Sequence, residues 1–202
     1  MVRLSIGLVG VAALAGCTPP EPTHSVSLGS GDVIAASPDG YCVDMTTSRP
    51  QDDFALLAPC STLGAAGETP DVIGVVTVQV GPVESGLIAE DEIALRDFLI
   101  TDSGTELLSR TGNAKDIEVL STQAFSNQVM VHFTDQGAPP LTGLQREEWR
   151  AFRNINGRLV TIAVRGLAAA PLQDGPGATL LKQILSGVQA PPVEATDSPA
   201  EI

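Results

Sequence analysis

Short apolar runs separated by Gly, Pro and polar turns dominate the middle of the chain. Runs of this length that are rich in β-branched residues are typical of strands, and residues 71–80 are apolar on both faces, as expected of a central strand. The strands predicted ahead of the C-terminal part are 32–37, 41–45, 54–60, 71–80, 117–125 and 129–134. The pattern therefore predicts a domain that is rich in strands.

The clearest hairpin lies within residues 147–167, where Asn156-Gly157 is the residue pair that a two-residue type I′ turn requires. Counting outward from this turn places Glu148 opposite Arg165, and the pairing of opposite charges supports the register. The other face of the hairpin is mostly apolar. We therefore expect that face to line the core.

Two longer segments, residues 89–100 and 173–187, have apolar residues at helical spacing, and residues 105–113 can add a short helical segment. Acids in the first turn of 89–100 complement the helix dipole, so a bound cation is the weaker explanation for them. Asp174 is a candidate cap of the closing helix. The side of the first helix expected to be buried consists of Ile93, Leu95, Phe98 and Leu99.

The order of these elements predicts a single α+β domain at residues 32–188, in which two helices flank an antiparallel sheet. A length of 202 residues with 43% hydrophobic content fits one globular domain. Residues 17–31 are rich in Pro, Ser and Thr without apolar periodicity, which indicates a flexible tether. Residues 189–202 are interpreted in the same way as a disordered tail.

The first residues indicate export from the cytoplasm. Arg3 precedes an apolar run, residues 4–15, that is shorter than the about 20 residues a helix needs to span a bilayer. Leu14-Ala15-Gly16-Cys17 resembles the lipobox of bacterial lipoprotein precursors. The resemblance implies that residues 1–16 are a signal peptide and that Cys17 carries the lipid. The alternatives are an ordinary secretory signal with a chance Cys, or a short buried helix.

The cysteine count predicts a disulfide. If Cys17 is lipidated, the other two cysteines of the chain, Cys42 and Cys60, form an even pair in an oxidising compartment. A redox pair or a metal site is less well supported, because the chain has no Cys-x-x-Cys motif and only two His.

The net charge of −13 makes nucleic acid an unsuitable partner, because an acidic surface gains nothing from counterion release. Membrane attachment is therefore expected through the N-terminal lipid alone. These features predict a lipid-anchored protein on the periplasmic side of the cell envelope. Thr18, in place of an Asp, follows Cys17 and gives a slight preference for the outer membrane.

Basic residues are concentrated near the C-terminus: residues 17–140 contain 18 acids and 4 bases, whereas residues 141–202 contain 6 of each. A group of arginines there can form a docking face for an acidic partner, since Arg is enriched at interfaces. The alternative, which we favour, is that they pair with nearby acids. The candidate residues are Arg146, Arg150, Arg153, Arg158 and Arg165.

No catalytic constellation is present in the sequence, which lacks a G-x-S-x-G elbow, a Gly-rich phosphate loop and an H-E-x-x-H motif. His132 alternates away from the apolar row of its strand and is interpreted as a surface or second-layer side chain. Glu147 and Glu148 point to opposite faces of a strand and are expected to be solvated. We therefore expect no enzymatic activity, no cofactor and no metal.

The last two thirds of the chain resemble the Mog1/PsbP-like fold, which also occurs in bacterial DcrB-type lipoproteins. The features that carry the resemblance are the Trp-containing hairpin, the strand at residues 157–164 and the C-terminal amphipathic helix. The resemblance implies a non-catalytic binding or assembly role. The function we expect is that of an envelope lipoprotein that binds another envelope protein, and this hypothesis predicts a sizeable exposed apolar or Arg-rich patch and no deep polar pocket. The alternative is a periplasmic small-ligand binder or sensor, which would have a concave pocket with convergent polar groups.

Overall fold

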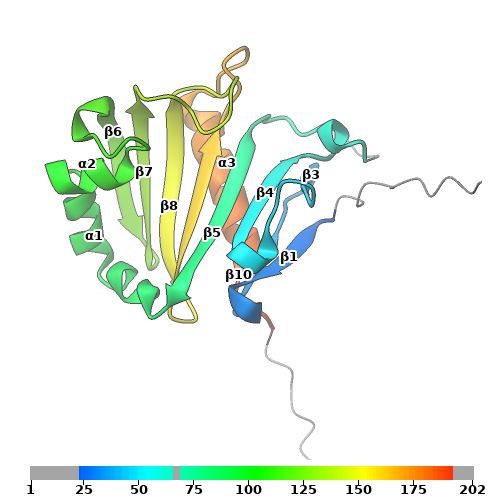
Figure 1. Ribbon diagram of the computed structural model, residues 1–202, viewed down its shortest axis with the longest axis horizontal. Helices are drawn as coiled ribbons and strands as arrows, with labels where there is room; N and C mark the ends of the chain where they lie inside the picture. Colours follow the sequence, from blue (N-terminus) through cyan, green and yellow to red (C-terminus); the bar gives the residue numbers. More distant parts are fainter. Residues whose placement is uncertain (1–22, 66–68, 193–202) are drawn as a thin grey trace, which may run out of the picture.

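A seven-stranded sheet in which every neighbouring pair is antiparallel forms the body of the molecule, with the strand order β3-β4-β5-β9-β8-β7-β6 (Figure 1). The computed structural model describes residues 23–65 and 69–192. The strands of this sheet are β3 Tyr41–Val43, β4 Phe54–Pro59, β5 Val75–Val83, β6 Ile117–Phe125, β7 Gln128–Asp135, β8 Glu147–Ile155 and β9 Arg158–Arg165. The predicted α+β fold with an antiparallel sheet is confirmed.

The β8–β9 hairpin has the predicted register. Ile155 pairs with Arg158, and Trp149 pairs with Val164. The turn residues Asn156 and Gly157 have φ values of 51° and 77°, as the two positive φ angles of a type I′ turn require.

The two faces of the sheet are covered by different helices. Helix α3, Asp174–Gly187, packs on β8 and β9, whereas α1, Glu92–Leu99, and α2, Asp102–Leu108, lie at the β6–β7 end (Figure 1). Alternate residues of β7 separate the two layers: Val131 joins the cluster beneath α1 and α2, and Met130 joins the cluster beneath α3. The sequence predicted two flanking helices and a short helical segment at residues 105–113. Helix α2 begins three residues earlier, at Asp102, and ends at Leu108, so only the first part of the predicted segment is helical.

The main core lies between α3 and the centre of the sheet. Alternate residues of β8 and β9 point toward the helix, whose buried stripe is Leu180, Leu181, Ile184 and Leu185. Gly177 allows the helix to approach Trp149, because a Cβ at that position would lie 2.4 Å from the indole ring.

No helix of the described ranges is long and apolar enough to cross a membrane.

A second sheet of three strands joins the two ends of the folded part. It consists of β1, Ser25–Leu28, β2, Val33–Ala36, and β10, Val188–Gln189, with β2 in the centre. The strand β1 lies inside the segment that was expected to be a flexible tether. This part of the segment is ordered instead, because β1 pairs with β2 and its apolar positions alternate with serines, so that Leu28 is buried. The signal peptide, the lipobox and the tail beyond residue 192 lie outside the described residues.

Within the described residues, four short 3₁₀ helices and one irregular turn, η1, whose residues have positive φ, connect these elements. They are η1 Gly29–Gly31, η2 Pro50–Asp52, η3 Cys60–Leu63, η4 Ser85–Ala89 and η5 Ala114–Asp116. Of these, η3 carries one half-cystine, and η4 leads from β5 into α1.

Candidate functional site

The five candidate arginines lie in several different surroundings. Arg153 donates hydrogen bonds to the carbonyls of Leu185 (3.1 Å) and Val188 (3.2 Å) at the C-terminal end of α3. Arg158 pairs with Asp32 at 2.7 Å. Both side chains are on the α3 side of the hairpin, and each is engaged by this chain.

Arg150 and Arg165 lie on the face of the sheet away from α3, where both contact Glu148. Arg146 lies in the loop before β8. Glu148 accepts a hydrogen bond from Arg150 at 2.5 Å and forms an ion pair with Arg165. Arg146 donates to the side-chain oxygen of Gln136 at 2.6 Å. The structure therefore brings Arg150 and Arg165 together, and it distributes the set over both faces of the sheet.

Glu148 differs from the expectation that it would be solvated, because only 2% of the residue is exposed. The predicted pairing with Arg165 explains its burial, since an ionised carboxylate leaves water at low cost only when it is paired and hydrogen-bonded.

A hollow of about 470 Å³ lies on the same face of the sheet, across β4, β5, β9 and β8. Its floor includes Leu56 and Ala163, and the loop residue Leu141 borders it. Its charged lining consists of Arg49, Arg110, Arg150, Arg165 and Glu148. The hollow thus combines apolar surface with an excess of guanidinium groups.

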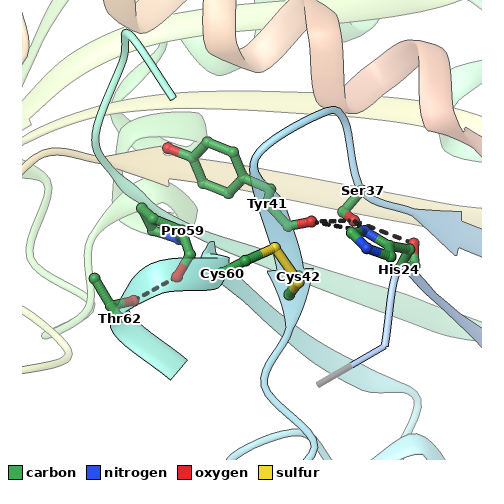
Figure 2. Close-up of a disulfide and its surroundings, with 7 residues drawn as sticks. All are labelled: His24, Ser37, Tyr41, Cys42, Pro59, Cys60 and Thr62. Atoms are coloured by element: carbon green, nitrogen blue, oxygen red, sulfur yellow. Dashed lines mark hydrogen bonds between the residues drawn. A yellow bond between two sulfur atoms is a disulfide. The ribbon is translucent and has the colours of Figure 1, made fainter. Parts of the chain in front are cut away.

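The predicted disulfide between Cys42 and Cys60 is present, and it joins β3 to the start of η3 (Figure 2). His24 lies beside it, where its Nδ1 atom is 3.2 Å from the carbonyl oxygen of Tyr41. The two sulfur atoms are bonded to each other, so they are not thiolate ligands, and this His-Cys-Cys group is not a metal site in the oxidised protein.

Exposed apolar side chains gather in one stretch of the chain. Of the eleven large hydrophobic residues exposed within the described ranges, seven lie between residues 83 and 107, on the end of β5, η4, α1 and α2. Helix α1 contacts both η4 and α2, so these elements are neighbours in space. We call this surface the α1 face; its members are Val83, Leu87, Ile88, Ile93, Phe98, Ile100 and Leu107.

The burial of α1 differs from the sequence prediction. Leu95 and Leu99 are buried against β7, but Ile93 is 47% exposed and Phe98 is 39% exposed. At 100° per residue Ile93 lies about 200° from Leu95, so one narrow stripe contacts the sheet and the remaining apolar residues face outward.

Acidic groups lie in the same stretch of the chain as the α1 face. Residues 83–107 contain seven acids and a single base, Arg96, and six of those acids are exposed. Asp91 caps α1 by accepting a hydrogen bond from the amide of Ala94 at 2.9 Å, so this carboxylate has a role at the start of the helix that needs no bound cation.

A cluster of one His and two carboxylates was not predicted from the sequence. His132 is buried between the sheet and α3, and its ring stacks on Trp149 with 4.4 Å between centroids. One nitrogen and a carboxylate oxygen from each of Glu147 and Asp174 lie within 4.8 Å of one another. Burial lowers the pKa of the His132 imidazole, and the charges of Asp174 and Glu147 partly oppose that shift.

Comparison with known proteins places the fold. No family model and no curated protein matches the chain. The Ran-binding protein Mog1p of Saccharomyces cerevisiae is similar in structure, with a TM-score of 0.51 and 14% identity over 82% of this chain and 94% of that one. A point mutant of Mog1 gives a TM-score of 0.52, also at 14% identity over 82% and 94% of the two chains.

The solution structure of the cyanobacterial PsbP of Synechocystis is a more distant neighbour, with a TM-score of 0.43 and 11% identity over 88% of this chain and 98% of that one. At 14% identity the two Mog1 structures show the fold alone. The structural resemblance predicted from the order of the elements is confirmed at that level.

Proposed function

We propose that this chain is a lipid-anchored protein of the cell envelope whose folded domain binds another protein through the α1 face, without catalysis. The observation that carries the proposal is the concentration of seven exposed apolar side chains on η4, α1, α2 and the adjoining end of β5. Single exposed apolar residues are ordinary, but their gathering on neighbouring elements is typical of an interaction surface.

The charges around the α1 face define the partner's chemistry. Exposed carboxylates such as Glu90, Asp91 and Asp97 lie on or directly beside the same elements as the apolar residues, and a protein that binds there must complement both properties. We therefore propose a partner with an apolar patch that is bordered by Lys and Arg. The name of Mog1p describes it as a Ran-binding protein, which supports a protein-binding role for this fold as a class.

The test is site-specific cross-linking in intact envelopes. A photo-reactive amino acid at Leu87 should cross-link to a protein segment rich in apolar and basic residues, and the yield of the cross-link should fall when salt is raised before irradiation. Leu87→Asp combined with Ile93→Asp should abolish the complex. The matched control is Leu120→Asp, which changes an exposed apolar residue of β6 and should leave the complex intact.

The outcome that contradicts the α1 face as the binding site is a complex that survives the double substitution or is lost equally in the control. A partner without basic residues at the contact would contradict the proposed chemistry.

The envelope anchor is tested separately. Wild-type chain should incorporate labelled palmitate, and Cys17→Ala should not, because Cys42 and Cys60 are joined to each other. Equal labelling of both proteins would contradict lipidation at Cys17.

The hollow beside Glu148 supports a second candidate function, the binding of a small anionic ligand. A volume of about 470 Å³ with four guanidinium groups in its lining fits this alternative. A thermal-shift screen with small carboxylates and inorganic phosphate tests it: a shift that is lost in Arg150→Met and kept in Arg96→Met would favour ligand binding over protein docking as the role of the domain.

A further inference from the structure

Three ligand-type side chains from separate elements converge beside the C-terminal half of β7. His132 lies on β7, Glu147 begins β8, and Asp174 begins α3. In the β7–β8 ladder Glu147 pairs with Thr134, which makes it a diagonal neighbour of His132 on the α3 side of the sheet. The close packing of α3 on Trp149 brings Asp174 to the same place.

The imidazole is held in position but is not satisfied. His132 is 93% buried, as its exposed fraction is 7%, and its ring lies nearly parallel to the Trp149 indole at an interplanar angle of 12°. Its buried Nε2 atom has no hydrogen-bond partner. A buried polar atom without a partner costs folding free energy, so the unpaired nitrogen indicates a bound group that can bond to it.

The spacing of the three groups also fits an ion. Within the described ranges, no ion pair of 4.0 Å or less joins His132 to either carboxylate, yet all the ligand atoms lie within 4.8 Å. Two ligands of one metal are separated by up to twice a bond length of about 2.0–2.2 Å, so small side-chain rotations suffice to close the site. The gap is too wide for hydrogen bonds between the groups themselves.

We propose that His132, Glu147 and Asp174 bind a divalent transition-metal ion of the zinc type. One imidazole with two carboxylates suits such an ion better than magnesium or calcium, which prefer ligand sets made only of oxygen. Three protein ligands leave further coordination positions for water. An adjoining hollow of about 260 Å³, lined in part by Gln123, Asp174 and Ala178, provides access from solvent.

The single Trp of the chain makes the site observable. A paramagnetic ion on His132 lies against the stacked indole and should quench its fluorescence. We would titrate Co²⁺ into the untagged full chain carrying Cys17→Ala, which removes the remaining thiol, and follow both Trp149 emission and the visible Co²⁺ absorption. Saturation at one equivalent is expected, and Zn²⁺ should displace Co²⁺.

Substitution of a residue that only supports a metal ligand usually weakens metal binding by about 10–100-fold. Asp174→Asn and His132→Gln change ligands themselves, so each should weaken Co²⁺ binding by at least as much. Asp174 is exposed, so its variant keeps the test valid if His132→Gln folds poorly. The matched control is His24→Gln, at the other His of the chain, which should bind like the parent protein.

The proposal is overturned if the parent chain does not bind Co²⁺, if Asp174→Asn binds it as tightly as the parent, or if His24→Gln loses binding to the same extent. Zn²⁺ should also raise the unfolding midpoint of the parent protein and of His24→Gln, and not that of Asp174→Asn.

Discussion

Glu148 and Arg165 form an ion pair whose side chains are only 3% and 5% exposed. The pair lines the hollow on the face of the sheet away from α3. The guanidinium of Arg165 also donates hydrogen bonds of 3.1 Å to the carbonyls of Gln145 and Arg146, so the pair connects the β8–β9 hairpin to the loop that precedes it. Removal of one partner would leave a charge buried without compensation.

We expect Glu148→Gln to lower the free energy of unfolding by about 3–5 kcal/mol, because it leaves two guanidinium groups without their carboxylate. Glu148→Leu with Arg165→Met should cost clearly less, since no charge remains buried. Urea unfolding measures both. A loss in Glu148→Gln no larger than that in the exposed control Glu106→Gln would show that the pair contributes little.

Tyr41 gives a prediction for alkaline pH. Its hydroxyl donates to the carbonyl of Val72 at 2.8 Å and accepts from the amide of Gly74 at 2.9 Å. Burial raises the pKa of Tyr41 to about 12, and the hydrogen bond from Gly74 partly opposes the shift. Since the chain has one Tyr, absorbance at the phenolate band reports this group alone.

The unfolded chain should ionise near pH 10, as an ordinary Tyr does, about two units below the folded protein. The neutral phenol therefore contributes stability below pH 10, and about 3 kcal/mol is lost as the pH rises from about 10 to 12. A phenolate midpoint near 10 while the circular dichroism is still native would contradict this account.

The disulfide should stabilise the fold mainly through the unfolded state. The bridge closes a loop with a sequence separation of 18, for which the chain-entropy model gives about 3 kcal/mol. We expect the double variant Cys42→Ser and Cys60→Ser to lose about this amount in urea unfolding. Reductant should destabilise the parent protein to a similar degree and leave the double variant unchanged.

Two glycines of α3 provide a matched pair of substitutions. A Cβ at Gly177 would lie 2.4 Å from Trp149, so Gly177→Ala should destabilise the protein by about 1–3 kcal/mol and shift the Trp emission. At Gly175 a Cβ would meet nothing within 4 Å apart from its chain neighbours, so Gly175→Ala should cost clearly less than Gly177→Ala. Any cost there comes from Pro176, because a residue with a Cβ is disfavoured in helical backbone just before a proline. Equal effects at the two positions would contradict the packing argument.

Local signals account for the parts of the fold that could be predicted from the sequence. The Asn156-Gly157 pair determines the turn, and counting from it places Trp149 opposite Val164. The Cys42–Cys60 pairing follows from a count of cysteines in the chain.

The remaining features depend on contacts between elements distant in sequence. The strand β1 is too short to stand out beside a Pro-rich segment and is held by pairing with β2. Which apolar residues of α1 are buried depends on where the short helix meets β7. The cluster at His132 requires β7, β8 and the start of α3 to be placed together, and no spacing in the sequence of one element contains that information.

The position of β2 between β1 and β10 has a consequence for the time course of folding. Its pairing with Val188 joins an early segment of the chain to one of its last described residues. Contacts this distant form slowly, because the intervening chain must be ordered before the pairing is favourable. The three-stranded sheet should therefore close late, after α3 has docked, and a chain emerging from a translocon or ribosome reaches its native state only once Val188 has been released.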